Sequence, residues 1–322
     1  MSLHVGINLT EFNIEDFRIF VVDDNDFDLK TLTTTLKLFG FDVVGQASSA
    51  EEAITRLFET EGVSAPICDL VLLDINLPEM NGDELCEQLS NHHVYSSVPV
   101  IMITGDDDVA VLEKAYNAGA VDFIRKPFNR IELNARVMSA ARNSYQQKEL
   151  RYLAHYDRLT GLVNRTLLLD RLETSIKQAK RNNTQVVMLF IDLDNFKSLN
   201  DTLGHDMGDI ALKITAERLL HCTRNSDTVA RYGGDEFVIL LTNVDPAGGR
   251  HHPQRIVDQL NEKLAEPYML GETDLGETSW HLGGSVGIAT FPDDADNLEM
   301  LLKIADMKMY KEKTLRKNEI NL

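Results

Sequence analysis

Residues 17–127 alternate short apolar runs with amphipathic stretches, and this alternation restricts the fold more than any other feature of the chain. Short apolar runs followed by polar loops predict buried strands of a parallel sheet at Arg18–Val22, Leu70–Leu73 and Val98–Ile103. Helical spacing predicts helices at Asp28–Phe39, Ala50–Glu59, Gly82–Ser90 and Val109–Ala118. Strands alternating with helices predict a doubly wound α/β domain, in which ligands collect at the carboxyl ends of the strands.

Carboxylates stand at two of these strand ends. Asp23 and Asp24 follow the first predicted strand, and Asp74 ends the second. Two carboxylates about 4 Å apart repel by roughly 4 kcal/mol at an effective dielectric of about 20, so such a cluster favours a bound cation. Mg2+ suits oxygen ligands of this kind, and Lys126 offers a positive charge for an incoming phosphoryl group. Taken singly, each Asp is explained better as a helix cap.

Taken together, these motifs resemble the receiver domain of bacterial response regulators over residues 17–130. The matching segments are Val21-Val22-Asp23-Asp24, Leu72-Leu73-Asp74 with Pro78 and Gly82 downstream, Ile103-Thr104-Gly105, and Lys126-Pro127. The resemblance implies that Asp74 accepts a phosphoryl group from a sensor histidine kinase. The residues it places around that group are Asp23 and Asp24 with Mg2+, Thr104 and Lys126 at the phosphoryl oxygens, and Phe123 as the switch aromatic, where Tyr is common.

A long helix is predicted after the first domain, because no Pro or Gly occurs between Pro127 and His155. Leu133, Val137, Ala140 and Ser144 recur at a spacing of three to four residues. Two interpretations stay open: a seam that pairs with its copy in a dimer, or a solvated connector helix. The predicted organisation is an N-terminal extension at 1–16, a receiver domain at 17–130, a helical linker at 131–155 and a second domain at 156–322.

The second domain is predicted to be a mixed α/β domain with acidic residues at its strand ends. Strands are expected at Gln185–Asp192 and His281–Thr290, two more around Gly233-Gly234 within Thr228–Leu241, and helices at Asp206–Cys222 and Leu298–Lys313. If the strands are neighbours, Asp192, Asp235 and Glu236 converge and favour a divalent metal, which would assist displacement at phosphorus.

Arg231-Tyr232-Gly233-Gly234-Asp235-Glu236-Phe237 resembles the signature of GGDEF diguanylate cyclases. The accompanying motifs are Asp157-Arg158-Leu159-Thr160-Gly161-Leu162-Val163-Asn164-Arg165, Phe196-Lys197, Asn200-Asp201, Gly204-His205 and Gly208-Asp209. The resemblance implies that two GTP molecules condense into cyclic di-GMP and two pyrophosphates in a dimer. The implied Mg2+ ligands, with Mn2+ as an alternative metal, are Asp192, the Leu193 carbonyl, Asp235 and Glu236. The implied GTP contacts are Asn200 and Asp209 at guanine, Lys197, Lys313 and Lys317 at the phosphates, and Phe196. The implied catalytic residues are Asp235 as general base, Lys197 and Glu236.

Two further positions matter for this resemblance. Arg224 and Asp227 stand at the offset of the family's product-binding inhibitory site, although an Arg and an Asp three residues apart also form ordinary local pairs. Arg316-Lys317-Asn318 replaces the usual Gly-Arg-Asn. Lys317 keeps a phosphate contact but loses bidentate geometry, so affinity for GTP is expected to suffer.

Composition excludes some other classes of function. A net charge of −19 argues against broad surfaces for nucleic-acid polymers or anionic membranes. No apolar stretch approaches the ~20 residues needed to span a bilayer, and no secretory signal is recognised, so we expect a cytoplasmic protein. Two rival functions stay open: a cyclic di-GMP receptor without activity, and a signalling adaptor that works through receiver contacts.

Overall fold

The computed structural model describes residues 12–58, 65–105, 109–244, 253–273 and 276–320. The chain divides into two compact units, residues 1–150 and 151–322. Of the predicted N-terminal extension, only residues 12–16 are described, and Ile14–Asp16 forms a single 3-10 turn. Within the described residues, no helix is long and apolar enough to cross a bilayer.

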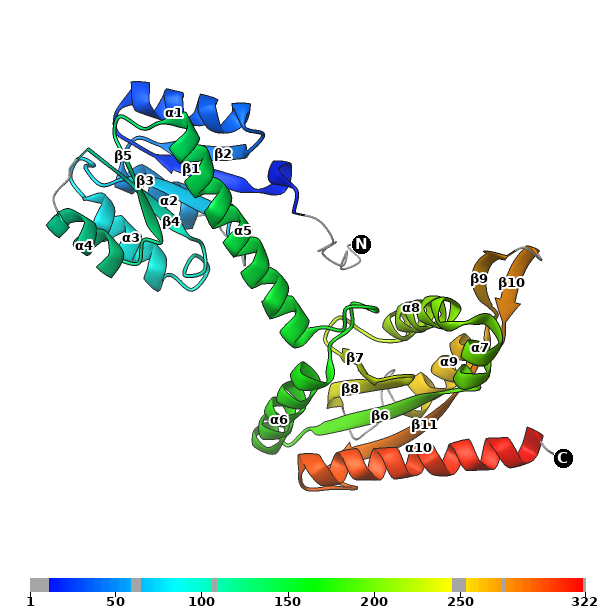
Figure 1. Cartoon of the computed structure of the whole chain (residues 1–322). Helices are drawn as coiled ribbons and strands as arrows, with labels where there is room; N and C mark the ends of the chain where they lie inside the picture. Colours follow the sequence, from blue (N-terminus) through cyan, green and yellow to red (C-terminus); the bar gives the residue numbers. More distant parts are fainter. Residues whose placement is uncertain (1–11, 59–64, 106–108, 245–252, 274–275, 321–322) are drawn as a thin grey trace. The chain divides into compact units, whose positions relative to one another are not determined.

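The N-terminal unit is a five-stranded parallel sheet with the strand order β2-β1-β3-β4-β5 (Figure 1). Its strands are β1 (Arg18–Val22), β2 (Asp42–Ala47), β3 (Leu70–Asp74), β4 (Val100–Thr104) and β5 (Asp122–Arg125). β3 and β4 are buried along their whole length, which explains their unbroken apolar sequence. Val22 at the end of β1 pairs with Leu73 of β3, so the carboxyl ends of these two strands are adjacent. The predicted doubly wound fold is confirmed.

Helices cover both faces of this sheet. Buried side chains of α1 (Asp26–Leu38) and α5 (Arg130–His155) form one core, and those of α2 (Ala50–Phe58), α3 (Gly82–Asn91) and α4 (Val109–Asn117) form the other. Each helix contributes an apolar stripe at helical spacing, such as Leu29, Leu32 and Leu36 of α1.

The apolar seam predicted for the linker belongs to the core of the N-terminal unit. Leu133 and Val137 are fully buried against β1, β3 and β4, and Lys148 pairs with the buried Asp69 at 2.6 Å. Both interpretations of the seam were therefore wrong, because α5 is the fifth helix of the sheet and covers the apolar face that α1 leaves open. The domain boundaries themselves stay predictions.

The C-terminal unit is built on a sheet with the order β11-β6-β8-β7. Its strands are β6 (Gln185–Asp194), β7 (Thr228–Gly233), β8 (Glu236–Val244) and β11 (Gly283–Phe291), all paired antiparallel, and an isolated parallel bridge joins Val163 to Ala230. A separate hairpin, β9 (Tyr268–Thr273) and β10 (Gly276–Trp280), was not foreseen.

Two layers of helices enclose this second sheet (Figure 1). α6 (Arg165–Asn182) and α10 (Leu298–Ile320) pack on one face, while α7 (Phe196–Leu203), α8 (His205–His221) and α9 (Pro253–Ala265) pack on the other. The turn between β7 and β8 uses Gly234 at φ +56°, a conformation that favours glycine. The end of β6 and the beginning of β8 lie beside α10, and the predicted acidic residues Asp192 and Glu236 lie there.

Candidate functional site

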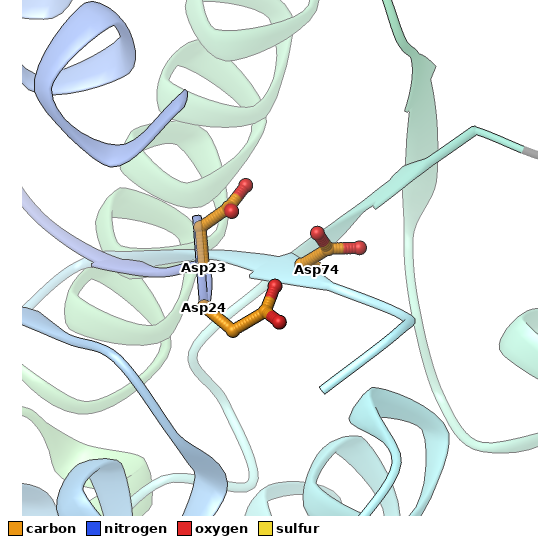
Figure 2. A group of neighbouring side chains, drawn as sticks. All are labelled: Asp23, Asp24 and Asp74. Atoms are coloured by element: carbon orange, nitrogen blue, oxygen red, sulfur yellow. The ribbon is translucent and has the colours of Figure 1, made fainter. Parts of the chain in front are cut away.

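Three carboxylates gather at the carboxyl edge of the N-terminal sheet. Asp23 and Asp24 follow β1, and Asp74 ends β3; Figure 2 shows the three side chains at this shared edge. One oxygen from each lies within 4.8 Å of the others, and among the described residues this is the only such group of three acidic, His or Cys ligands. The structure thus brings together the three residues that the sequence predicted to share a cation.

Lys126 lies against this cluster. Its Nζ is 2.5 Å from Asp74, 2.9 Å from Asp23 and 3.0 Å from Asp28, a carboxylate that sequence reasoning missed. Burial alone would lower the pKa of Lys126, but hydrogen bonds to these carboxylates raise it, so the amine stays charged. Burial raises the pKa of Asp23 despite the contact with Lys126.

The donor set of the cluster fits Mg2+. Lys126 Nζ lies 2.9 Å from the second carboxylate oxygen of the buried Asp23, and the same ammonium group also pairs with Asp28 and Asp74. One positive charge shared among these carboxylates leaves the cluster net negative, and a hard cation held by one or two carboxylates and water would balance it. Asp23, Asp24 and Asp74 are the residues that would hold such an ion.

The two remaining predicted residues of this unit, Thr104 and Phe123, lie on the neighbouring strands β4 and β5. Thr104 is buried at the end of β4, and its carbonyl accepts from the Lys126 backbone at 2.7 Å. Phe123 lies half-buried on β5, with the Tyr116 ring 6.2 Å away and the Arg136 guanidinium 5.4 Å from its centroid. Thr104 ends β4, whereas Phe123 is the second residue of β5, and the roles of both stay predictions.

A second acidic edge lies where β6 meets β8. Asp192 pairs with Glu236 in the strand register, and the Leu193 amide donates to the Asp235 carbonyl at 3.3 Å. Burial raises the pKa of Glu236, and the nearby carboxylates of Asp192 and Asp235 raise it further. Asp192 forms an ion pair with Lys313 of α10, yet burial still raises its pKa. Raised carboxylate pKa values at one edge fit a site that a divalent cation would complete.

A pocket of about 440 Å³ opens at this edge. Its lining residues are Asp192, Glu236, Asp306, Met309, Tyr310, Lys313, Thr314, Lys317 and Asn318. Acidic groups from the sheet and basic groups from α10 thus face one cavity, an arrangement suited to a metal-bound polyphosphate. Asp306 was missed by sequence reasoning, because a single Asp within a helix pattern carries no signal of its own.

The predicted guanine contacts lie on α7 and α8 and do not line that pocket. Asn200 Oδ1 is buried and has no hydrogen-bond partner among the described residues. It lies beside Gly208, where an added Cβ would approach it to 1.9 Å, and the Phe196 ring lies at the same place. Asp209 and Lys197 are exposed. An unpartnered buried amide oxygen is consistent with a role for Asn200 in binding a ligand, and the whole set stays a prediction.

Arg231 connects the turn between β7 and β8 to the beginning of the C-terminal unit. Its Nη1 lies 3.2 Å from both carboxylate oxygens of Asp157, and its Nε and Nη2 donate to the Gly234 carbonyl at 3.0 and 2.8 Å. The Asp157 carboxylate also accepts from the Thr160 amide and hydroxyl. The motif that begins at Asp157 and the motif that begins at Arg231 are therefore in direct contact in the folded domain.

The predicted inhibitory pair lies on the segment before β7. The Arg224 amide donates to the Asp227 carboxylate at 3.0 Å, while the Arg224 side chain is exposed. Burial raises the pKa of Asp227. This local contact is the one expected of an ordinary turn, so product binding stays a prediction.

Comparison with protein families matches residues 154–319 to "Diguanylate cyclase, GGDEF domain" and residues 19–138 to "Response regulator receiver domain". The chain is 36% identical over 222 residues to the bifunctional diguanylate cyclase/cyclic di-GMP phosphodiesterase MucR of Pseudomonas aeruginosa, an alignment covering 69% of this chain and 30% of MucR. Response regulator PleD of Caulobacter vibrioides is 29% identical over 310 residues, or 94% of this chain and 65% of PleD.

Among solved structures, the GGDEF domain of TpbB (YfiN) from Pseudomonas aeruginosa is 37% identical, covers 50% of this chain and 90% of that one, and superposes with a TM-score of 0.46. The chain spans less than two thirds of the length of MucR and of PleD. The GGDEF match extends over more than half of the residues. The chain therefore belongs to the GGDEF family of diguanylate cyclases and carries a response-regulator receiver domain before its GGDEF domain.

Proposed function

We propose that this protein is a diguanylate cyclase whose receiver domain controls it through phosphorylation of Asp74. The observation that carries the proposal is the pocket at the β6–β8 edge, where Asp192 and Glu236 face Lys313 and Lys317. Opposed acidic and basic groups in one cavity suit a nucleoside triphosphate with its divalent cation.

In this proposal each GGDEF domain holds one GTP. Asp192, the Leu193 carbonyl and Asp235 or Glu236 would hold Mg2+, which when bound neutralises phosphate charge and polarises the α-phosphorus. Lys313 and Lys317 contact the phosphates, and Asn200 and Asp209 select guanine through hydrogen bonds to its edge. Lys317 offers a single charged group and cannot bind a phosphate bidentately, so it binds the phosphates more weakly than an arginine would.

The reaction requires two copies of the domain, because the product is a two-fold symmetric ring. Each ribose 3′-hydroxyl attacks the α-phosphorus of the other nucleotide, a P–O bond forms, and the bond to pyrophosphate breaks. Asp235 accepts the proton of the hydroxyl. A two-fold dimer presents two half-sites to each other and holds both nucleotides at reacting distance.

Control by the receiver would use the acidic cluster around Asp74. A phosphoryl group on Asp74 adds negative charge beside Lys126, which now bonds Asp23, Asp28 and Asp74. Lys126 and Thr104 then bind the phosphoryl oxygens, and the surface around Phe123 repacks. A sensor histidine kinase is the proposed phosphodonor, and the repacked surface favours the productive dimer.

Binding of the product at Arg224 and Asp227 would limit turnover. Arg224 is exposed on its segment and suited to bind a phosphate bidentately or to stack on guanine. Arg224→Ala should then keep the initial rate and remove the slowing that added cyclic di-GMP causes.

The activity is tested by incubating the full chain with GTP and Mg2+ and separating the nucleotides by chromatography. We expect cyclic di-GMP from the unaltered chain and none from Asp235→Ala. Binding of cyclic di-GMP without any turnover of GTP would instead favour the receptor function, and absence of nucleotide and metal binding would favour the adaptor.

A further inference from the structure

Two ion pairs join β6 to α10 side by side. Lys313 pairs with Asp192, and Arg316 Nη1 lies 3.7 Å from Asp194 Oδ2. The acidic partners are two residues apart on a strand and the basic partners three apart on a helix, so each set lies on one face of its element. The two pairs therefore fix the register of α10 along the end of β6.

Arg316 makes further contacts through its second terminal nitrogen. Its Nη2 donates to Glu312 at 2.6 Å and to the Asn261 amide oxygen of α9 at 3.2 Å. The other oxygen of Glu312 accepts from the Val286 amide of β11 at 3.1 Å. The planar guanidinium, with several donors in a fixed geometry, thus joins α10 to β6 and α9, and to β11 through Glu312.

Asp194 is itself held in place from the sheet. The hydroxyl of the fully buried Ser285 donates to Asp194 Oδ1 at 2.8 Å, which leaves Oδ2 for Arg316. Asp192 and Lys313 line the pocket, whereas Asp194 and Arg316 are not among its lining residues. A nucleotide that enters the pocket can therefore break the Asp192–Lys313 pair and leave the Asp194–Arg316 pair intact.

We propose that Arg316 is a positioning residue that keeps Lys313 and Lys317 over the pocket once Asp192 has exchanged Lys313 for a metal ion. The inference rests on the proposed function, in which Asp192 binds Mg2+ and Lys313 turns to phosphate. After that exchange, the contacts of Arg316 to Asp194 and Asn261 still hold this turn of α10 against β6 and α9. Lys317 is the next residue of the helix, so its position depends on the same contacts.

The test compares Arg316→Gln and Arg316→Lys with the unaltered full chain in steady-state kinetics with GTP and Mg2+. Arg316→Gln should raise KM for GTP roughly fivefold and change kcat by less than about twofold, because phosphate contacts act in the ground and transition states alike. Arg316→Lys should recover part of the lost KM. Asp194→Asn should match Arg316→Gln, and the double variant should add little.

Lys308→Gln is the matched control, because Lys308 lies on the same helix as Arg316 and is not among the pocket-lining residues. It pairs at 2.9 Å with Asp294, which lies before the helix begins. This control variant should leave KM unchanged. A normal KM in Arg316→Gln, even with lower thermal stability, would reduce Arg316 to a structural residue and overturn the proposal. The same conclusion follows if Lys308→Gln raises KM equally.

Amide hydrogen exchange separates this inference from the proposed function. If the unaltered chain makes no cyclic di-GMP, the proposed function fails. The rate of amide exchange over residues 311–318, measured with Mg2+ present, then tests the positioning role of Arg316 by itself. Faster exchange there in Arg316→Gln than in Lys308→Gln would support the positioning role. Equal exchange would overturn it.

Discussion

The contact between Asp157 and Arg231 should be a main determinant of the stability of the GGDEF domain. Asp157→Asn keeps an oxygen for the Thr160 amide but removes the charge that Arg231 contacts through both carboxylate oxygens. Hydrogen bonds to charged groups contribute about 1.5–3 kcal/mol each, and this pair is largely shielded from solvent, with side chains 24% and 15% exposed. We expect the free energy of unfolding to fall by about 2 kcal/mol, with a Tm lower by about 4–8 °C.

Trp280 offers a direct assay, because it is the single tryptophan of the chain and packs against the core of the GGDEF domain. Urea unfolding followed by its fluorescence should be measured for Asp157→Asn, Arg231→Gln and the double variant. The double-mutant cycle isolates the pair from the bonds of Arg231 to Gly234.

A coupling energy below about 0.5 kcal/mol would refute this reasoning. Lys177→Gln is the control, since its pair with Glu173 is more than half exposed on both sides. Exposed pairs of this kind contribute about 0–1 kcal/mol, so this variant should unfold almost as the unaltered chain does.

The receiver domain allows two further predictions. Gly82→Ala would place a Cβ 2.1 Å from the backbone carbonyl of Asp74, so we expect the receiver to lose about 3 kcal/mol of stability, detected by calorimetry as a lower unfolding temperature of this domain. Burial alone would raise the pKa of Asp69, but hydrogen bonds from Arg18 and Lys148 hold it below its ordinary 3.8. Folding thus favours the charged form, and its stabilisation is present above that pH and lost as pH falls through the lower folded-state value. Asp69→Asn should therefore lose stability at pH 7, and urea unfolding should show the deficit shrinking below about pH 4; a deficit of equal size at all pH values would contradict the assignment.

Much of the sheet architecture follows from local pattern. β1, β3 and β4 were predictable because strands buried on both faces are continuously apolar. β2 was missed, because it is an edge strand whose residues alternate between exposed and half-buried. α5 shows a different limit: its apolar spacing is the same whether the partner is its own sheet or a second helix, so the pattern reveals a buried face and not the partner.

The candidate sites likewise contain residues that local pattern predicts and residues that it does not. Asp23, Asp24 and Asp74 were predictable as a group because the carboxyl ends of adjacent parallel strands meet at one edge. Asp28 was not, because it lies in the first turn of α1, where an Asp has a local explanation.

Contacts between segments far apart in the chain could not be predicted from the sequence. Asp157 and Arg231 lie 74 positions apart, and each appeared only as part of a separate motif. Arg316 appeared only as a departure from the usual glycine, and its contacts to Asp194 and Asn261 depend on how α10 packs against β6 and α9. No periodicity in one segment specifies such a partner in another.

The central claim is that the receiver controls the cyclase, and one measurement tests it most directly. The initial rate of cyclic di-GMP formation from GTP and Mg2+ should be compared with and without beryllofluoride, a mimic of the phosphoryl group on Asp74. We predict a higher rate with beryllofluoride, accompanied by a shift toward dimer, and no increase in Asp74→Asn. An equal rate and an unchanged oligomeric state with beryllofluoride bound would contradict the account.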